Sequence, residues 1–408
     1  MTIIQADWIV TCDEYDSIIE NGCIVFDKTI VDLGSFEEIS SKYPNSPIQK
    51  TDPNTVILPG LINPHVHLEF SANKTTLRYG NFMTWLNSVI EHRADLIEKA
   101  DTELIDNELQ SILKSGTTTI GAISSYGFDM ESLQKTKLNV VHFSEIIGSN
   151  ASMVDTLFAD FQARLKSSSK LKSDRYTPAI AIHSPYSVHP FLIRETLNLA
   201  REQNLAVTAH FLESQEEKDW LESSSGGMLE FFKTFLNQTQ SITKSHEFLN
   251  QFKGIKNLSF THCCQANKEE LEVIDELKAT IIHCPVSNRF LTNATMDYKD
   301  LEHRTFAIGT DGLSSNYSLS LWEEMKNALF IHKNVDITTL AKKLLNASTK
   351  GGAKALGFEN KGSLKKGYDA DIISVTLPDT CTKKDIFLHM ILHTSVANAI
   401  FIKGEKIV

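Results

Sequence analysis

The residues best suited to chemistry are two histidines, His65 and His67, at the end of an apolar run that begins at Val56. Successive side chains of a strand point to opposite faces, so histidines at positions i and i+2 project from the same face. Two imidazoles placed in this way can hold one metal ion. A lone His-x-His pair also fits a solvated strand end, so this interpretation depends on further ligands at equivalent places in the chain.

Other short apolar runs also end in side chains that could bind a metal. These are Glu145, His183, His210 with Glu213, His262, His283 and Asp311. Polar groups at so many strand ends are hard to explain by packing, because each would otherwise be buried without a partner. Their placement therefore supports a site built from several strands.

The β-rich runs alternate with segments whose apolar residues recur at helical spacing, such as Trp85, Leu86, Val89 and Ile90. The eight runs lie at 56–67, 117–123, 138–145, 178–183, 205–210, 258–262, 280–283 and 305–311. Eight strands alternating with helices predict an α/β fold, a (β/α)₈ TIM barrel, whose chemistry sits at the carboxyl ends of the strands.

The two ends of the chain have a different pattern of short strands and turns. We expect residues 1–55 and 359–408 to form one small β-sandwich built from both termini, with the barrel at 56–358. The chain would leave the sandwich, form the barrel and return.

Composition excludes some classes of partner. The 408 residues carry a formal net charge of −11 with no basic stripe, which argues against nucleic acid. No segment resembles a signal peptide or a membrane span, so we expect a cytoplasmic protein with no membrane partner. The six cysteines show no framework spacing and are expected to be free thiols.

The strand-end motifs together resemble those of the amidohydrolase superfamily, within the branch of nucleoside and aminopurine deaminases and triazine chlorohydrolases. They are PGLINPHVH at 59–67, HFLE at 210–213, TH at 261–262, HCPVSN at 283–288, GTDGLSSN at 309–316 and GYDADI at 367–372. The likeness covers essentially the whole chain. The segments AIS at 122–124, HSPYSV at 183–188 and HFLES at 210–214 resemble, more narrowly, the 6-aminodeoxyfutalosine deaminases of menaquinone biosynthesis.

The residues themselves predict a metal centre. His65, His67 and His210 with Asp311 would give one divalent ion four protein ligands and leave a position for water. The ion would lower the pKa of that water from about 15.7 to about 7. Binuclear relatives carry a bridging lysine on the fourth strand, and residues 179–187 contain none, so one metal is expected. Nitrogen and oxygen ligands suit both Zn²⁺ and Fe²⁺, and we expect Zn²⁺.

Three residues are predicted to handle protons. Glu213, three residues beyond His210, could protonate a purine ring nitrogen, as a glutamate does in zinc deaminases of other folds. His262 would orient the water, and Asp311 would share its proton, as in related enzymes. Two alternatives stay open: Glu213 could begin a solvated acidic helix face with Glu216 and Glu217, and His262 could be a core histidine.

Substrate contacts follow from the resemblance and from position. Relatives use a histidine at the place of His183 to hold the sugar or the leaving-group side, although it could instead make only an orienting hydrogen bond. The segment of Trp85 covers the nucleoside in relatives. Glu145 and Ser314 are further strand-end candidates, although Ser314 could serve only to shape its loop. An aromatic carboxylate beyond the ribose would need a cation. The nearest candidates in the sequence are Arg289, which we prefer, and Arg78, although both could equally be surface charges.

The resulting prediction is a metal-dependent deaminase that converts 6-amino-6-deoxyfutalosine to futalosine and ammonia, expected as a homodimer. One alternative is deamination of adenosine, S-adenosylhomocysteine or methylthioadenosine. Thr84 argues against adenosine and S-adenosylhomocysteine, because adenosine-type relatives carry a glutamate there. A chlorohydrolase or a guanine deaminase on the same scaffold would carry similar motifs. A metal-free scaffold protein is disfavoured, because no position of the ligand set is missing.

Overall fold

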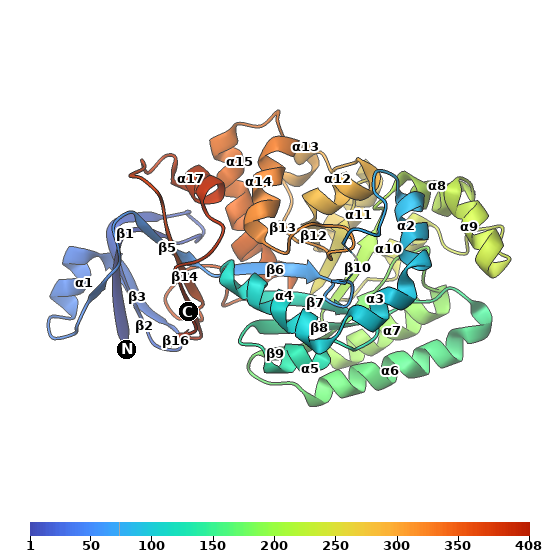
Figure 1. The fold of residues 1–408 in the computed structure, drawn as a ribbon, viewed down its shortest axis with the longest axis horizontal. Helices are drawn as coiled ribbons and strands as arrows, with labels where there is room; N and C mark the ends of the chain where they lie inside the picture. The colour runs from blue at the N-terminus through green and yellow to red at the C-terminus, as the bar shows by residue number, and fades with distance from the viewer. Residues whose placement is uncertain (73) are drawn as a thin grey trace.

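The computed structural model describes residues 1–72 and 74–408, and its chain forms two sheets (Figure 1). One sheet is built from both ends of the chain, and both termini lie in it. The other is a parallel sheet of eight strands surrounded by helices. The predicted TIM barrel with a small β-domain formed by the two termini is therefore confirmed.

The terminal sheet runs in the order β16-β15-β14-β5-β1-β2-β3, with β4 beside β1. Alternate residues of its strands fill two cores, as a period of two requires. Ile24 and Phe26 of β2 pack in one core with Phe401, whereas Cys23 and Val25 pack against Ile39 on the other face. The elements are β1 (Thr2–Val10), β2 (Ile18–Phe26), β3 (Ile30–Ser35), α1 (Phe36–Lys42), β4 (Gln49–Lys50), β5 (Thr55–Pro59), β14 (Ile372–Thr376), β15 (Ala399–Ile402) and β16 (Glu405–Lys406).

The barrel sheet runs in chain order from β6 to β13, and every pair of neighbouring strands is parallel. Its strands are β6 (Leu61–Val66), β7 (Thr117–Ser124), β8 (Asn139–Ile146), β9 (Tyr176–Ile182), β10 (Val207–Phe211), β11 (Leu258–His262), β12 (Thr280–His283) and β13 (Phe306–Ile308). Each of the eight predicted runs contains a barrel strand, the first only in its second half. The expected helical spacing is also confirmed, since Trp85, Leu86, Val89 and Ile90 all lie in the helix α2 (Phe82–Glu91).

The helices around the barrel vary in length from one turn to several. They are α2 (Phe82–Glu91), α3 (Arg93–Lys99), α4 (Thr102–Lys114), α5 (Met130–Lys135), α6 (Val154–Lys170), α7 (Pro190–Gln203), α8 (Gln215–Ser223), α9 (Gly227–Leu236), α10 (Ser245–Asn250), α11 (Lys268–Glu276), α12 (Pro285–Thr292), α13 (Tyr298–Leu301), α14 (Leu321–Ile331), α15 (Ile337–Asn346), α16 (Gly352–Ala355) and α17 (Ile386–His393). A 3₁₀ turn, η1 (Ala151–Met153), precedes α6, and a π-helical turn, η2 (Ala347–Gly351), precedes α16.

The first predicted strand needs a correction, because the run 56–67 forms two strands in different sheets. Residues Thr55–Pro59 pair with β1 and β14 in the terminal sheet, and the barrel strand begins only at Leu61. The chain changes sheets at Gly60. The N–H of Gly60 donates to the carbonyl oxygen of Asp371, whereas the N–H of the next residue, Leu61, donates to the carbonyl oxygen of Gly116. Thr118 lies so close to Gly60 that a Cβ there would clash. Apolar composition alone could not reveal this break.

The seam of the barrel lies between β13 and β6. The side chain of Asn63 spans it, donating from Nδ2 to Thr310 Oγ1 (2.7 Å) and accepting from the N–H of Thr310 (3.3 Å). The N–H of Asp311 bonds the carbonyl of His65 across the same seam at 3.1 Å. These bonds hold the first and last strand ends together, and both ends carry residues of the predicted metal site.

The C-terminal part also reaches the barrel. Helix α17 packs against α14 and α15, and its Phe387 and Met390 belong to the main hydrophobic core (Figure 1). The division of the chain at residues 55 and 358 stays a prediction. Among the described residues, none of the helices combines the length and apolar character that crossing a bilayer requires.

Candidate active site

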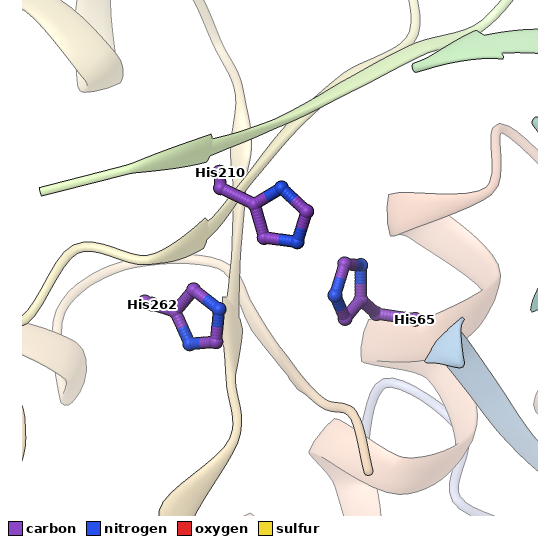
Figure 2. Close-up of side chains that lie close together, drawn as sticks. All are labelled: His65, His210 and His262. Atoms are coloured by element: carbon purple, nitrogen blue, oxygen red, sulfur yellow. The ribbon is translucent and has the colours of Figure 1, made fainter. Parts of the chain in front are cut away.

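The histidines at the ends of β6, β10 and β11 point their rings into one shared space, as Figure 2 shows for His65, His210 and His262. The ring centroids of His65 and His210 are 4.9 Å apart, and those of His210 and His262 are 5.5 Å apart. In Figure 1, β6 runs away from the terminal sheet, so this site lies at the barrel end that faces α2 and α9. The expected location at the carboxyl ends of the strands fits this arrangement.

The four predicted ligands lie together. The Nε2 atom of His67 is 3.2 Å from Nε2 of His65 and 3.3 Å from Nε2 of His210. Asp311 Oδ1 lies 3.6 Å from His67 Nε2 and 3.8 Å from His65 Nε2. Three nitrogens and one carboxylate oxygen from β6, β10 and the end of β13 therefore surround one small volume.

Hydrogen bonds outside this volume orient the ligand side chains. Asp311 Oδ2 accepts from the hydroxyls of Ser287 (2.7 Å) and Ser315 (2.8 Å), and its Oδ1 accepts from the N–H of Gly312 (2.8 Å). The backbone is left-handed at Asp311 (φ 58°) and at His262 (φ 74°). Such conformations cost energy in non-glycine residues and cluster at functional sites. Here they turn both side chains out of the strand direction and into the site.

The chemical state of these side chains fits a divalent metal ion. Burial lowers the pKa of His65, His67 and His210 below the usual histidine value, so the imidazoles are neutral near pH 7. Burial alone would raise the pKa of Asp311, but His67 and the other nearby imidazoles hold it well below its usual range. Neutral imidazoles and an ionised carboxylate are the donors that Zn²⁺ and Fe²⁺ take.

Glu213 lies beside His262 at the edge of this volume. It precedes α8 and is only 8% exposed, so the alternative of a solvated helix face does not describe it. Burial, with a contribution from Asp311, raises its pKa well above the usual value. Its Oε1 lies 3.6 Å from His262 Nε2 and has no hydrogen-bond partner in the described part of the chain. The raised pKa favours the protonated form of this carboxyl group.

A hydrogen bond on the side of the ring away from Glu213 orients His262. Its Nδ1 lies 2.8 Å from Asn288 Oδ1, so Nδ1 carries the proton and Nε2 faces Glu213. His262 is also near enough to His65 and His210 to share a metal ion with them. The imidazole can therefore accept a proton on the side of the site.

Glu217 is a site residue that sequence reasoning missed. We expected it only as part of the alternative acidic face, but it is fully buried. Its carboxyl oxygens accept the N–H groups of Leu212 (3.1 Å) and Glu213 (2.9 Å). Ser214 caps α8 by accepting the N–H of Glu217 at 3.1 Å, which turns this glutamate inward. The motif Ser-x-x-Glu at 214–217 was the available signal.

The site opens into a cavity of about 560 Å³. His183, Trp85 and Ser314 line it together with most of the predicted ligands. Trp85 Nε1 donates to the carbonyl of Ser314 at 2.8 Å, which joins α2 to the loop after Asp311. His183 Nδ1 bonds Ser187 Oγ at 2.6 Å, and burial lowers the pKa of His183 to about 4.

Besides His65, two other strand-end residues lie outside the cavity lining. Glu145 is buried near His183 and His210, and its Oε2 accepts from Ser125 Oγ at 2.5 Å. Its predicted contact with substrate stays a prediction. His283 points elsewhere, since its Nε2 lies 3.0 Å from Nε2 of His332.

The predicted arginines need a correction. Arg289 is exposed on α12 and does not line the cavity, because the helix turns its side chain outward. Arg78 is also exposed and pairs with Glu91 at 3.1 Å. The cavity lining instead includes Arg93, the first residue of α3, and Tyr126, two residues after β7, and sequence reasoning singled out neither.

Known proteins share both the sequence and the fold. The model of the amidohydrolase family matches residues 56–405. The chain is 46% identical over 391 residues to an aminodeoxyfutalosine deaminase of Nitratiruptor sp., covering 96% of each protein. It is 34% identical to an adenosine deaminase of Helicobacter pylori, covering 100% of this chain and 99% of that protein.

A solved structure is similar along the full length. The crystal structure of Helicobacter pylori aminofutalosine deaminase in complex with methylthio-coformycin matches with a TM-score of 0.95 at 33% identity, covering 100% of both chains. The family match and these full-length likenesses agree with the barrel fold. The chain belongs to the amidohydrolase family.

Proposed function

We propose that this hydrolase of carbon–nitrogen bonds is a metal-dependent deaminase that converts 6-amino-6-deoxyfutalosine to futalosine and ammonia, a step of menaquinone biosynthesis. The observation that carries the deaminase assignment is the buried carboxyl group of Glu213, which faces the cavity beside the ligand set without a hydrogen-bond partner in the described chain. The full-length likeness to the Nitratiruptor aminodeoxyfutalosine deaminase supports the substrate.

One divalent ion, held by His65, His67, His210 and Asp311, completes the site in this proposal. When bound, such an ion supplies Lewis acidity and makes a water molecule acidic enough to act as a nucleophile near neutral pH. We propose Zn²⁺, because a site of three histidines and a carboxylate suits it, although Fe²⁺ accepts the same donors.

The side chains supply the proton transfers. Attack by water at the amino-bearing carbon of the purine becomes feasible once the adjacent ring nitrogen is protonated, and Glu213 donates that proton. His262 Nε2, with its Nδ1 bonded to Asn288, accepts a proton from the attacking water and shares it with Asp311. The new carbon–oxygen bond then replaces the carbon–nitrogen bond. The amino group takes the proton from His262 and leaves as ammonia, and the second proton of the attacking water returns to the carboxylate of Glu213.

The nucleoside itself would be held by the remaining polar groups of the cavity. His183 contacts the sugar side, while Trp85 and Ser314, already joined by a hydrogen bond, cover the nucleoside. We further propose that the enzyme works in the cytoplasm as a homodimer.

A steady-state ammonia assay tests the function. The purified protein is given 6-amino-6-deoxyfutalosine, adenosine, S-adenosylhomocysteine, methylthioadenosine, guanine and a chlorotriazine. We expect kcat/KM to be highest for 6-amino-6-deoxyfutalosine. The likeness to the Helicobacter pylori adenosine deaminase makes adenosine the second candidate, and a higher kcat/KM for adenosine would replace our assignment with that one. No ammonia from any of these compounds would contradict the deaminase proposal as a whole.

A further inference from the structure

Two helices line the outer part of the cavity, and both present apolar residues at the same sequence spacing. Helix α2 contributes Trp85, Leu86, Val89 and Ile90, and helix α9 contributes Phe231, Phe232, Phe235 and Leu236. Positions i, i+1, i+4 and i+5 share one face of a helix, so each helix turns a continuous apolar face to the cavity. A flat apolar group fits this space better than a sugar or a polar chain does.

The inner part of the cavity carries the residues of the proposed reaction. Glu213, Glu217 and Asp311 all line it. In the proposed function the ligand set and Glu213 act on the purine, so a nucleoside with a negative charge at its far end has its purine in this part. Such a ligand would therefore place its charged end at the outer part.

Arg93, the first residue of α3, is the one Lys or Arg among the described residues that line the cavity. It makes no ion pair within the described chain, unlike Arg78, which pairs with Glu91. Its Nη2 donates to Tyr126 Oη at 2.6 Å, and its guanidinium lies 5.5 Å from the centre of the Tyr126 ring. The hydrogen bond occupies one of five N–H donors and leaves the positive charge uncompensated.

Tyr126, the hydrogen-bond partner of Arg93, lies in a loop that Glu69 holds in place. Glu69 accepts the N–H groups of Ser125 (2.7 Å), Tyr126 (2.9 Å) and Phe128 (2.7 Å), which fastens the loop after β7. The rings of Tyr126 and Phe128 stack with centroids 5.3 Å apart. Arg93 thus has a defined position at the cavity although its side chain is exposed.

We propose that Arg93, supported by Tyr126, is the specificity residue that binds the carboxylate of the substrate, while the apolar faces of α2 and α9 enclose the aryl ring that carries it. A carboxylate at the edge of an apolar cavity needs charged donors to offset the loss of water, and a guanidinium binds it through two parallel N–H groups. This assignment rests on the proposed function, and it replaces Arg289, which lies outside the cavity.

The test compares three variants on three substrates. The variants are Arg93→Met, Arg93→Lys and, as the matched control, Arg289→Met. The substrates are 6-amino-6-deoxyfutalosine, its carboxamide analogue, which lacks the charge, and methylthioadenosine, which lacks the aryl group. We expect Arg93→Met to lower kcat/KM for the carboxylate substrate about 10-fold more than for the carboxamide, through KM.

Two further readouts identify the charge as the cause. Arg93→Lys keeps the charge without the paired donors, so it should restore part of the loss. Added salt should raise KM of the wild-type enzyme for the carboxylate substrate, because exposed charges are screened, and should do so less in Arg93→Met. Arg289→Met should leave the ratio of carboxylate to carboxamide unchanged.

The outcomes separate this inference from the proposed function. Equal losses on the carboxylate and carboxamide substrates in Arg93→Met would overturn the role of Arg93, even if the wild-type enzyme prefers 6-amino-6-deoxyfutalosine. A selective loss in Arg289→Met would also overturn it. Failure of the wild-type enzyme to turn over 6-amino-6-deoxyfutalosine would instead overturn the proposed function.

Discussion

The Nδ1 atom of His210 lies 2.6 Å from the main-chain carbonyl oxygen of His183. A carbonyl oxygen can only accept a hydrogen bond, so Nδ1 carries the proton and Nε2 offers its lone pair to the site. The same carbonyl accepts the N–H of His210 at 3.0 Å. The pairing of β9 with β10 therefore sets the orientation of a proposed metal ligand as well as the register of the barrel.

Replacing His210 by Ala should remove this ligand. We expect the purified variant to lose about one equivalent of divalent metal and to have no measurable turnover, because three donors hold the ion much less firmly than four. Elemental analysis measures the metal. His303→Ala is the control, since the His303 side chain is 83% exposed, and it should keep its metal. Full metal content in His210→Ala would show that His210 is not a ligand.

Glu213→Gln separates proton donation from binding. The amide keeps the shape and the hydrogen-bonding reach of the side chain but cannot deliver a proton, so kcat should fall by roughly 10²-fold or more. Metal content should be unchanged, since Glu213 is not among the four proposed ligands. The control is Glu216→Gln, whose side chain contacts Asn81 and lies outside the cavity lining. Near-normal turnover in Glu213→Gln would place the proton donor elsewhere.

The repeating pattern of strands and helices made the barrel predictable. An apolar run that ends in a polar residue marks a strand end, and eight such runs in order determine which residues share the mouth of a barrel. His65, His210 and His262 could therefore be placed together although 197 residues separate the first from the last. This inference needs only the chain order of the strands.

The break at Gly60 and the burial of Glu217 could not be predicted in the same way. The strands on both sides of Gly60 are apolar, and only their pairing partners distinguish them. Glu217 belongs to a run of charged residues, and its burial depends on the path of the chain before α8. The wrong choice of Arg289 has the same origin, because closeness to a strand end in sequence does not say which way a helix turns a side chain.

Asn288 tests whether His262 must be oriented. Asn288→Ala removes the acceptor of His262 Nδ1, so the imidazole can change its tautomer and rotate. We expect kcat to fall about 10-fold to 100-fold with little change in KM, as is typical when the partner of an essential histidine is lost. Metal content and melting temperature, measured on the same sample, distinguish this effect from loss of structure. A change in KM alone would contradict an orienting role.

Glu324 provides a prediction about stability. Burial raises the pKa of this carboxyl group to about 8 in the folded protein, against a usual value of 4.5. The folded state therefore binds the proton more tightly than the unfolded state, and the free energy of unfolding falls as pH rises from about 4.5 to about 8. Gln at this position cannot ionise, so Glu324→Gln should gain stability relative to the wild type across this window, by at most about 1.4 kcal/mol per pH unit.

Urea unfolding at pH 5, 6, 7 and 8 measures the difference in the free energy of unfolding between the variant and the wild type. The contributions of other buried carboxyl groups cancel in this difference. Glu323→Gln, the partly exposed neighbour on α14, is the control and should follow the wild type at every pH. Parallel curves for Glu324→Gln and the wild type would show that Glu324 does not carry the proposed proton.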